Sequence, residues 1–218
     1  MYGIIAIDAL AGVAFVLLWY FLFLRYNRRK AIKILHSLRN AFAGQAQIIG
    51  VQWTGGSRFL VKLRVVSTHF QRASLQVHMY PREFPFRWLW SRFKKRQETM
   101  TFEADLECAP AFNLEVHNHR WSGRTRKFPQ DLRRLALDRC GPFVLTTRND
   151  WQREITAMMS ALVASRDCDF LSVCFRKMSP HFSATVPLGS IAATDSGSES
   201  QIFDVLRELA SCAQASRF

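Results

Sequence analysis

An uninterrupted apolar segment, Ala9–Leu24, decides the architecture of this chain, and it reads ALAGVAFVLLWYFLFL. Asp8 is the one charged residue between Gly3 and Leu24. A helix over these residues rises about 33 Å, which is enough to cross a hydrocarbon core about 30 Å thick. We therefore predict a transmembrane helix over residues 3–24.

Two other interpretations of this segment are disfavoured by its flanks and its composition. A cleaved signal peptide carries positive charge before its apolar region, whereas here the charge comes after it. A core helix of a soluble protein would show a polar stripe, and this segment has none. Trp19 and Tyr20 are unusual, because they fall one turn inside the predicted boundary rather than at it.

The charges around the span predict its orientation. Five basic residues come after the span and none precedes it: Arg25, Arg28, Arg29, Lys30 and Lys33. By the positive-inside rule, we expect a single-pass protein of the cell membrane with its N-terminus outside and its C-terminal domain in the cytoplasm. The five cysteines are scattered without a C-x-x-C spacing, which agrees with reduced thiols in the cytoplasm.

Length and composition limit the class of protein to which the chain can belong. It has 218 residues, of which 49% are hydrophobic, so it is neither a disordered tail nor a multi-pass transporter. Its net charge of +13 lies in the first part, since residues 1–147 hold 23 Lys/Arg against 9 Asp/Glu. We interpret this basic half as a face turned toward an anionic membrane.

Period-two alternation after the span predicts antiparallel strands. Residues 49–53 and 58–65 form a hairpin around Thr54–Ser57, and further alternating runs cover 73–80, 100–106 and 112–117. In the second half we expect a helix over Pro129–Arg139, a strand over Phe143–Thr147, a helix over 151–163 and a hairpin over 171–188. Pattern alone leaves open whether the two hairpin regions share one sheet.

The predicted fold class is α+β, with an antiparallel sheet of about five to eight strands covered by two to four helices. The predicted organisation is a transmembrane helix (3–24), a basic juxtamembrane helix (25–43), the sheet domain (44–189), a Ser/Gly-rich linker (190–201) and a C-terminal amphipathic helix (202–218).

The segment between the third and fourth strands combines aromatic and basic residues. A helix started by Pro85 would align Phe86, Leu89, Trp90 and Phe93 in one stripe. The predicted membrane-interface residues are Phe86, Arg87, Trp88, Leu89, Trp90, Arg92, Phe93, Lys94, Lys95 and Arg96. Packing of the stripe on the sheet, or contact with nucleic acid, are the alternatives.

A second basic cluster, with interleaved aromatic residues, predicts a patch for an anionic ligand. Its members are Arg120, Trp121, Arg124, Arg126, Lys127, Arg133 and Arg134. Such a surface suits an anionic lipid, an acidic protein or a nucleic-acid strand held by phosphate contacts and stacking. No nucleic-acid-binding signature accompanies the cluster.

Motifs for catalysis are missing from the sequence. It has no G-x-G-x-x-G, G-x-x-x-x-G-K-[ST], G-x-S-x-G or H-E-x-x-H, so we predict no catalytic residues and no cofactor. His117 and His119 share one side of a strand and are weak candidates for a metal site with Glu115, because no further ligand is fixed by spacing.

These features together predict a non-enzymatic scaffold or assembly factor, anchored by one span and held against the anionic inner leaflet. Its expected partners are membrane lipids and an unidentified protein, with nucleic acid less favoured. The alternative function is a membrane-tethered enzyme or binding module that takes a lipid headgroup or nucleic acid at the Arg120–Arg139 cluster.

Overall fold

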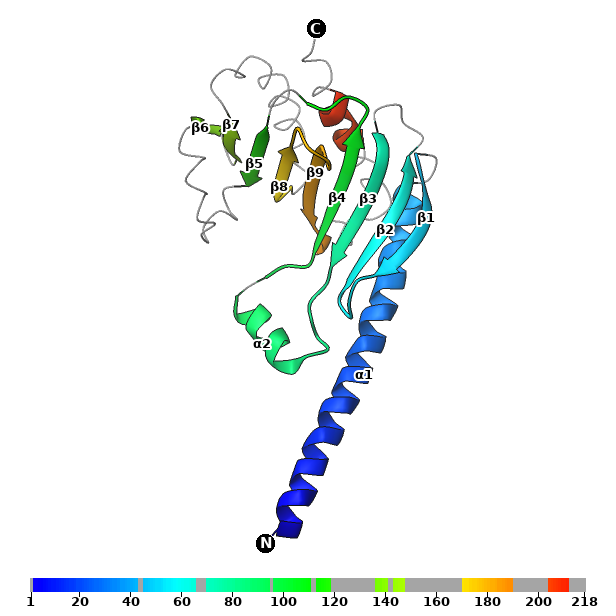
Figure 1. Cartoon of the computed structure of the whole chain (residues 1–218), viewed down its shortest axis with the longest axis vertical. Helices are drawn as coiled ribbons and strands as arrows, with labels where there is room; N and C mark the ends of the chain where they lie inside the picture. Colours follow the sequence, from blue (N-terminus) through cyan, green and yellow to red (C-terminus); the bar gives the residue numbers. More distant parts are fainter. Residues whose placement is uncertain are drawn as a thin grey trace.

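The structure is a computed structural model that describes residues 2–42, 45–65, 70–94, 96–110, 113–118, 136–140, 143–147, 170–189 and 204–211. A long helix projects from a twisted antiparallel sheet and covers part of one face of it (Figure 1). The predicted α+β class is confirmed. The sheet has nine strands, one more than the upper number expected.

The elements are arranged along the chain in the order α1 (Tyr2–Ala41), β1 (Ala46–Trp53), β2 (Arg58–Val65), β3 (Phe70–His78), α2 (Pro85–Phe93), β4 (Thr99–Leu106), β5 (Leu114–Asn118), β6 (Ala136–Cys140), β7 (Phe143–Thr147), β8 (Ser172–Phe175) and β9 (Phe182–Pro187). A further helix covers 204–211. In space the strands lie in the order β1-β2-β3-β4-β9-β8-β5-β7-β6, and every pairing is antiparallel.

Both halves of the domain share one sheet, a point that the sequence pattern left open. Strand β4 pairs with β9, so that Phe102 lies opposite Ala184 and Thr101 opposite Thr185. The two threonine hydroxyls are 3.1 Å apart and form a hydrogen bond. This contact joins residues more than eighty positions apart in the chain, and no local sequence pattern reports such a pairing.

The predicted helix over Pro129–Arg139 is wrong at its C-terminal end, where the chain forms strand β6. Residues Ala136–Cys140 pair with Phe143–Thr147, which is the strand predicted there. Pairing with β7 satisfies the backbone groups of a segment too short to be stable as a helix alone. Residues 129–135, the predicted helix 151–163 and the linker 190–201 lie outside the described residues.

The core lies between one face of the sheet and two helices. Alternate residues of β2 and β3, such as Phe59, Val61 and Leu75, are buried on that face. They pack in one cluster with Leu38 of α1 and Leu209 of helix 204–211. This alternation arises because successive strand residues point to opposite faces and only one face is covered by helices.

Helix α1 combines the two helices that the sequence predicts over 3–24 and 25–43. It is continuous through Ala41, and within the described chain it is the one helix long and apolar enough to cross a membrane. Residues 4–18 are all exposed, whereas Ala31, Leu38 and Phe42 are buried in the domain core. One helix therefore serves as the apolar projection and as a core element.

Candidate functional site: the junction between helix α1 and the domain

The connection between β3 and β4, residues 79–98, leaves the sheet and lies beside α1 (Figure 1). Its contacts with α1 begin within the apolar segment. The indole Nε1–H of Trp19 donates a hydrogen bond to the carbonyl oxygen of Arg82 at 3.0 Å. The rings of Trp19 and Trp88 have centroids 6.3 Å apart, and those of Tyr20 and Phe84 are 6.1 Å apart. Trp19 and Tyr20 thus contact the domain, which explains their place inside the predicted boundary.

A buried polar contact continues the junction toward the sheet. Asn27 of α1 is fully buried, and its Nδ2 donates to Glu83 Oε2 at 3.2 Å and to the carbonyl oxygen of Gly56 at 3.3 Å. Glu83 is also buried, with 7% of its surface exposed. A β-carbon at Gly56 would lie 2.9 Å from Glu83 Oε1, so glycine leaves room for the carboxylate.

An ion-pair network lies next to this contact. Glu98 binds Lys30 of α1 and Arg82, whose Nη2 lies 3.2 Å from Glu98 Oε1. The guanidinium carbon of Arg82 is 4.9 Å from the ring centroid of Tyr26 and 5.4 Å from that of Tyr80. Since the Glu98 side chain is only 10% exposed, losing one basic partner would leave a largely buried charge poorly compensated.

Helix α2 begins as the sequence predicts, with Pro85 in its first turn, where a missing N–H costs no hydrogen bond. The predicted stripe faces away from the protein, since Phe86 is 86% exposed, Phe93 73%, Trp90 60% and Leu89 48%. These side chains are therefore not part of the core, and the alternative of packing on the sheet is wrong.

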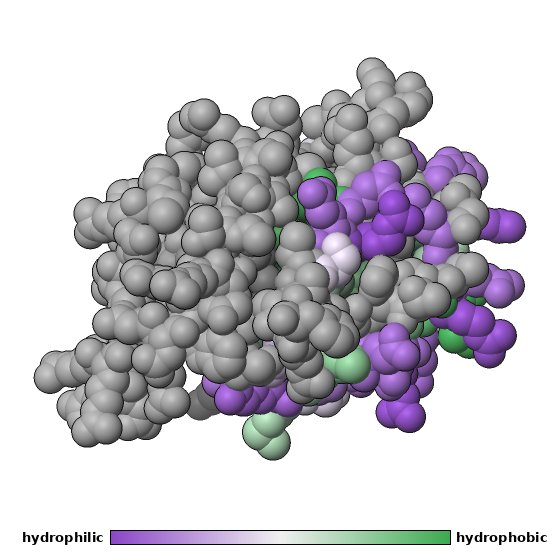
Figure 2. Space-filling model, turned by 90° about the horizontal axis from the view of Figure 1, so that it is seen from above, coloured by the Kyte–Doolittle hydropathy of each residue, from purple (hydrophilic) through white to green (hydrophobic). Residues whose placement is uncertain are grey.

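Basic residues surround this exposed stripe. Arg87, Arg92, Lys94 and Arg96 are exposed, and Lys94 Nζ lies 4.8 Å from the ring centroid of Trp90. Lys95 lies outside the described residues. By contrast, the described surface at the far end of the domain is mostly hydrophilic (Figure 2). Exposed rings beside exposed cations make α2 suited to a boundary between apolar and anionic surroundings.

The contact with Trp19 fixes the level of α2 along α1. Leu24, the end of the apolar segment, is five positions after Trp19, which corresponds to about 7.5 Å of helix. A bilayer that contained residues 3–24 would therefore extend past the level at which Trp88 contacts Trp19. The junction and the exposed face of α2 together form the candidate functional site.

The structure does not test the other predicted sites. Arg120, Trp121, Arg124, Arg126, Lys127, Arg133, Arg134 and His119 lie outside the described residues. His117 belongs to β5, where its backbone pairs with Val144 and Ser172, but its side chain is not described. Among the described residues, no three His, Cys, Asp or Glu side chains come close enough to hold a metal ion.

Sequence reasoning missed the junction residues Asn27, Gly56, Glu83 and Glu98. Two signals pointed to them. One is the place of Trp19 and Tyr20 inside the span, and the other is the presence of two carboxylates, Glu83 and Glu98, in an otherwise strongly basic connection. Both signals concern a contact between distant segments, and neither identifies the partner residue by itself.

Comparisons with known proteins give no family for this chain. No family model matches it, and no curated protein matches it. Among solved structures, one similar chain is the mycobacterial trehalose monomycolate transport factor A, TtfA. The similarity has a TM-score of 0.39 and 8% sequence identity, and it covers 70% of each chain.

Proposed function

We propose that this protein is a single-pass, membrane-anchored scaffold or assembly factor without enzymatic activity, whose α+β domain is held against the anionic inner leaflet. The observation that carries the proposal is the fixed position of α2 beside the apolar segment of α1. When α1 spans a bilayer, the exposed stripe of α2 meets the interface without further movement.

The proposed orientation rests on charge. The basic residues after the span favour a cytoplasmic domain, on the side where the leaflet is anionic. Each basic residue near such a surface contributes about 1 kcal/mol of attraction, and the exposed members of α2 and its C-terminal flank are Arg87, Arg92, Lys94 and Arg96. The aromatic stripe adds burial of apolar area in the interface.

The test is the depth of Trp90 in bilayers that contain brominated lipids, which quench tryptophans that reach the acyl chains. The full-length protein is reconstituted in vesicles with a phosphatidylglycerol fraction. Trp90→Phe is expected to lower the quenched share of the emission, because it removes a tryptophan at the interface. The matched control is Trp53→Phe, which removes a tryptophan on β1 and should lower the quenched share less than Trp90→Phe does. Equal effects of the two substitutions would contradict the proposal.

A further inference from the structure

Strand β1 forms one end of the nine-stranded sheet and pairs only with β2 in the described part of the chain. Its sequence, AQIIGVQW, contains no charged residue and no proline. Natural edge strands usually carry such residues to prevent other strands from pairing with them. Among the residues that the structure describes, none pairs with the outer edge of β1 or protects it from strand addition.

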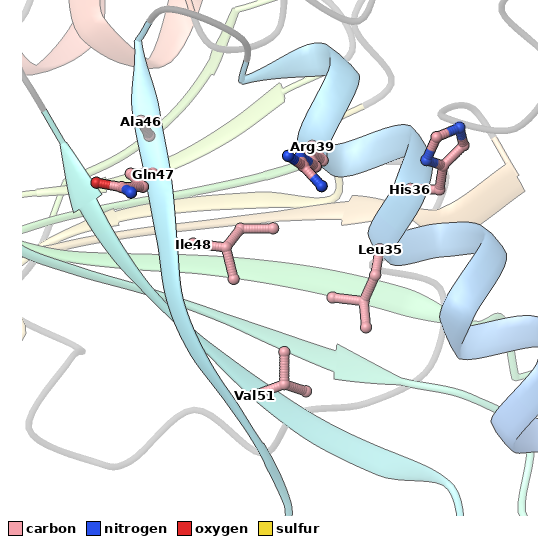
Figure 3. A pocket seen from close by; sticks show the side chains of 7 residues that line it. All are labelled: Leu35, His36, Arg39, Ala46, Gln47, Ile48 and Val51. Carbon is pink, nitrogen blue, oxygen red and sulfur yellow. The ribbon is translucent and has the colours of Figure 1, made fainter.

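A groove of about 680 Å³ runs between β1 and α1. Leu35 and Arg39 from α1 and Ile48 and Val51 from β1 point into it (Figure 3). The floor of the groove is continuous with the core, because Leu35 and Ile48 are partly buried against the core cluster. Val51 stays 40% exposed, so the groove leaves apolar surface uncovered.

A β-bulge gives the groove its apolar lining. The pairing register of β1 with β2 shifts between Ile48 and Gly50. In a regular strand, residues three positions apart point to opposite faces, whereas the extra residue of a bulge returns Val51 to the face of Ile48. Ile49, at the bulge itself, is 59% exposed and does not line the groove.

Positive charge borders this edge on both sides. Arg39 of α1 is exposed, as are Lys62 and Arg64 of β2, which lie opposite Gly50 and Gln47. An apolar edge between basic borders is complementary to an extended segment in which apolar side chains alternate with polar ones and whose ends carry acidic residues.

A second copy of the chain does not fit this edge when both copies are anchored in one membrane. Helix α1 runs beside strands β1 and β2 and roughly along their direction (Figure 1). Antiparallel pairing of β1 with its own copy would reverse the second α1. Parallel pairing about a two-fold axis would place each residue of β1 opposite the same residue of the second copy. The two side chains would then point to opposite faces of the sheet, whereas paired residues in a pleated sheet point to the same face.

We infer that β1 binds an extended, apolar and acidic segment of a partner protein as an additional strand, with its apolar side chains in the groove between β1 and α1. The exclusion of a second copy rests on the anchored orientation of the proposed function. The inference names the class of partner that the proposed scaffold would hold.

The test uses the full-length protein in lipid nanodiscs and a dye-labelled synthetic peptide of alternating valine and threonine with two aspartates at each end. Fluorescence anisotropy should show saturable binding, at least tenfold tighter than for the same peptide with lysines at its ends. Val51→Lys should weaken binding at least tenfold, because it replaces an apolar side chain that would contact the valines of the peptide by a long cationic one. The matched control Ile49→Lys, on the same strand outside the groove, should change binding less than twofold.

Hydrogen exchange distinguishes strand addition from other modes of binding. The bound peptide should slow exchange of amides in 46–53 and leave those of β3 unchanged. Three outcomes would overturn the inference: no binding at roughly millimolar peptide, binding without protection of β1, or disulfide cross-linking between copies through Val51→Cys, which would show a second copy at the edge. None of these outcomes is read from the depth of Trp90. The experiments therefore test the anchored orientation and the binding of a strand separately.

Discussion

The side-chain amide of Asn27, on helix α1, donates a hydrogen bond to the carboxylate of Glu83, on the connection between β3 and β4, across 3.2 Å. Both residues are buried, and the same amide nitrogen also reaches the carbonyl oxygen of Gly56. One side chain therefore links helix α1 to two separate turns of the domain.

Asn27→Leu should destabilise the domain by about 2 kcal/mol, because it leaves the buried carboxylate of Glu83 without its donor from α1. Denaturant unfolding of the full-length protein in detergent micelles measures the effect. The matched control is Asn40→Leu, which changes an exposed asparagine of the same helix and should alter the free energy of unfolding by less than about 0.5 kcal/mol. Similar losses for both variants would show that the Asn27 contact adds no stability.

Gly56→Ala should destabilise the protein by about 1–3 kcal/mol, because the new methyl group would approach Glu83 Oε1 to 2.9 Å and displace a carboxylate held by Asn27. Gly55→Ala is the control, since a β-carbon at Gly55 meets no atom within 4 Å. A difference between the two melting temperatures measures the effect of crowding at Glu83. If the two variants melt together, the space at Gly56 is not needed.

Phe86→Ser should change the free energy of unfolding in micelles by less than about 0.5 kcal/mol, because Phe86 is 86% exposed. Phe102→Ala should cost about 3–5 kcal/mol, since Phe102 is buried in the core. The same Phe86→Ser substitution should weaken contact of α2 with anionic vesicles, which is read from the quenching of Trp90. A loss of stability as large as that of Phe102→Ala would mean that α2 packs in the core instead.

The free energy of unfolding of the domain should decrease as the pH falls through about 6.5, and the titration of His78 should contribute to this dependence on pH. Burial, and then the positive charge of Arg58, lower the pKa of His78 in the folded protein. As the pH falls, the unfolded chain therefore takes up a proton on His78 that the folded protein disfavours. The resulting loss of stability is complete once the pH lies below the pKa of His78 in the folded protein.

Unfolding free energies at about pH 8 and about pH 5 measure this slope. His78→Gln should reduce it because the titrating group is gone, and Arg58→Gln should reduce it less because only the second cause is removed. An unchanged slope in His78→Gln would assign the pH dependence to other groups.

Local patterns in the sequence predicted much of the fold. Strand β2 of the first hairpin was predictable because one of its faces is buried and alternation reports that burial directly, whereas in β1 the bulge at Ile49 breaks the alternation. Helix α2 was predictable from Pro85 and the spacing of its aromatic residues. Its exposure was not, because an amphipathic stripe has the same pattern whether it faces a core or a membrane.

Contacts between distant segments limited prediction of the rest. The pairing of β4 with β9 depends on segments about eighty residues apart, and the pattern of each strand fits several neighbours. Asn27 lies in a basic run typical of a membrane flank, so its burial against Glu83 leaves no local trace. The conformation of segment 136–140 is decided by its partner strand and not by its own pattern, which is why the predicted helix there is wrong.

The continuity of α1 from Tyr2 to Ala41 means that no hinge separates its apolar segment from the sheet. Any tilt that the helix adopts in a bilayer is transmitted directly to the orientation of the domain. The same continuity sets where the chain can be shortened. A water-soluble fragment must begin before Asn27, because a later start would remove part of the helix that completes the core and the contact with Glu83.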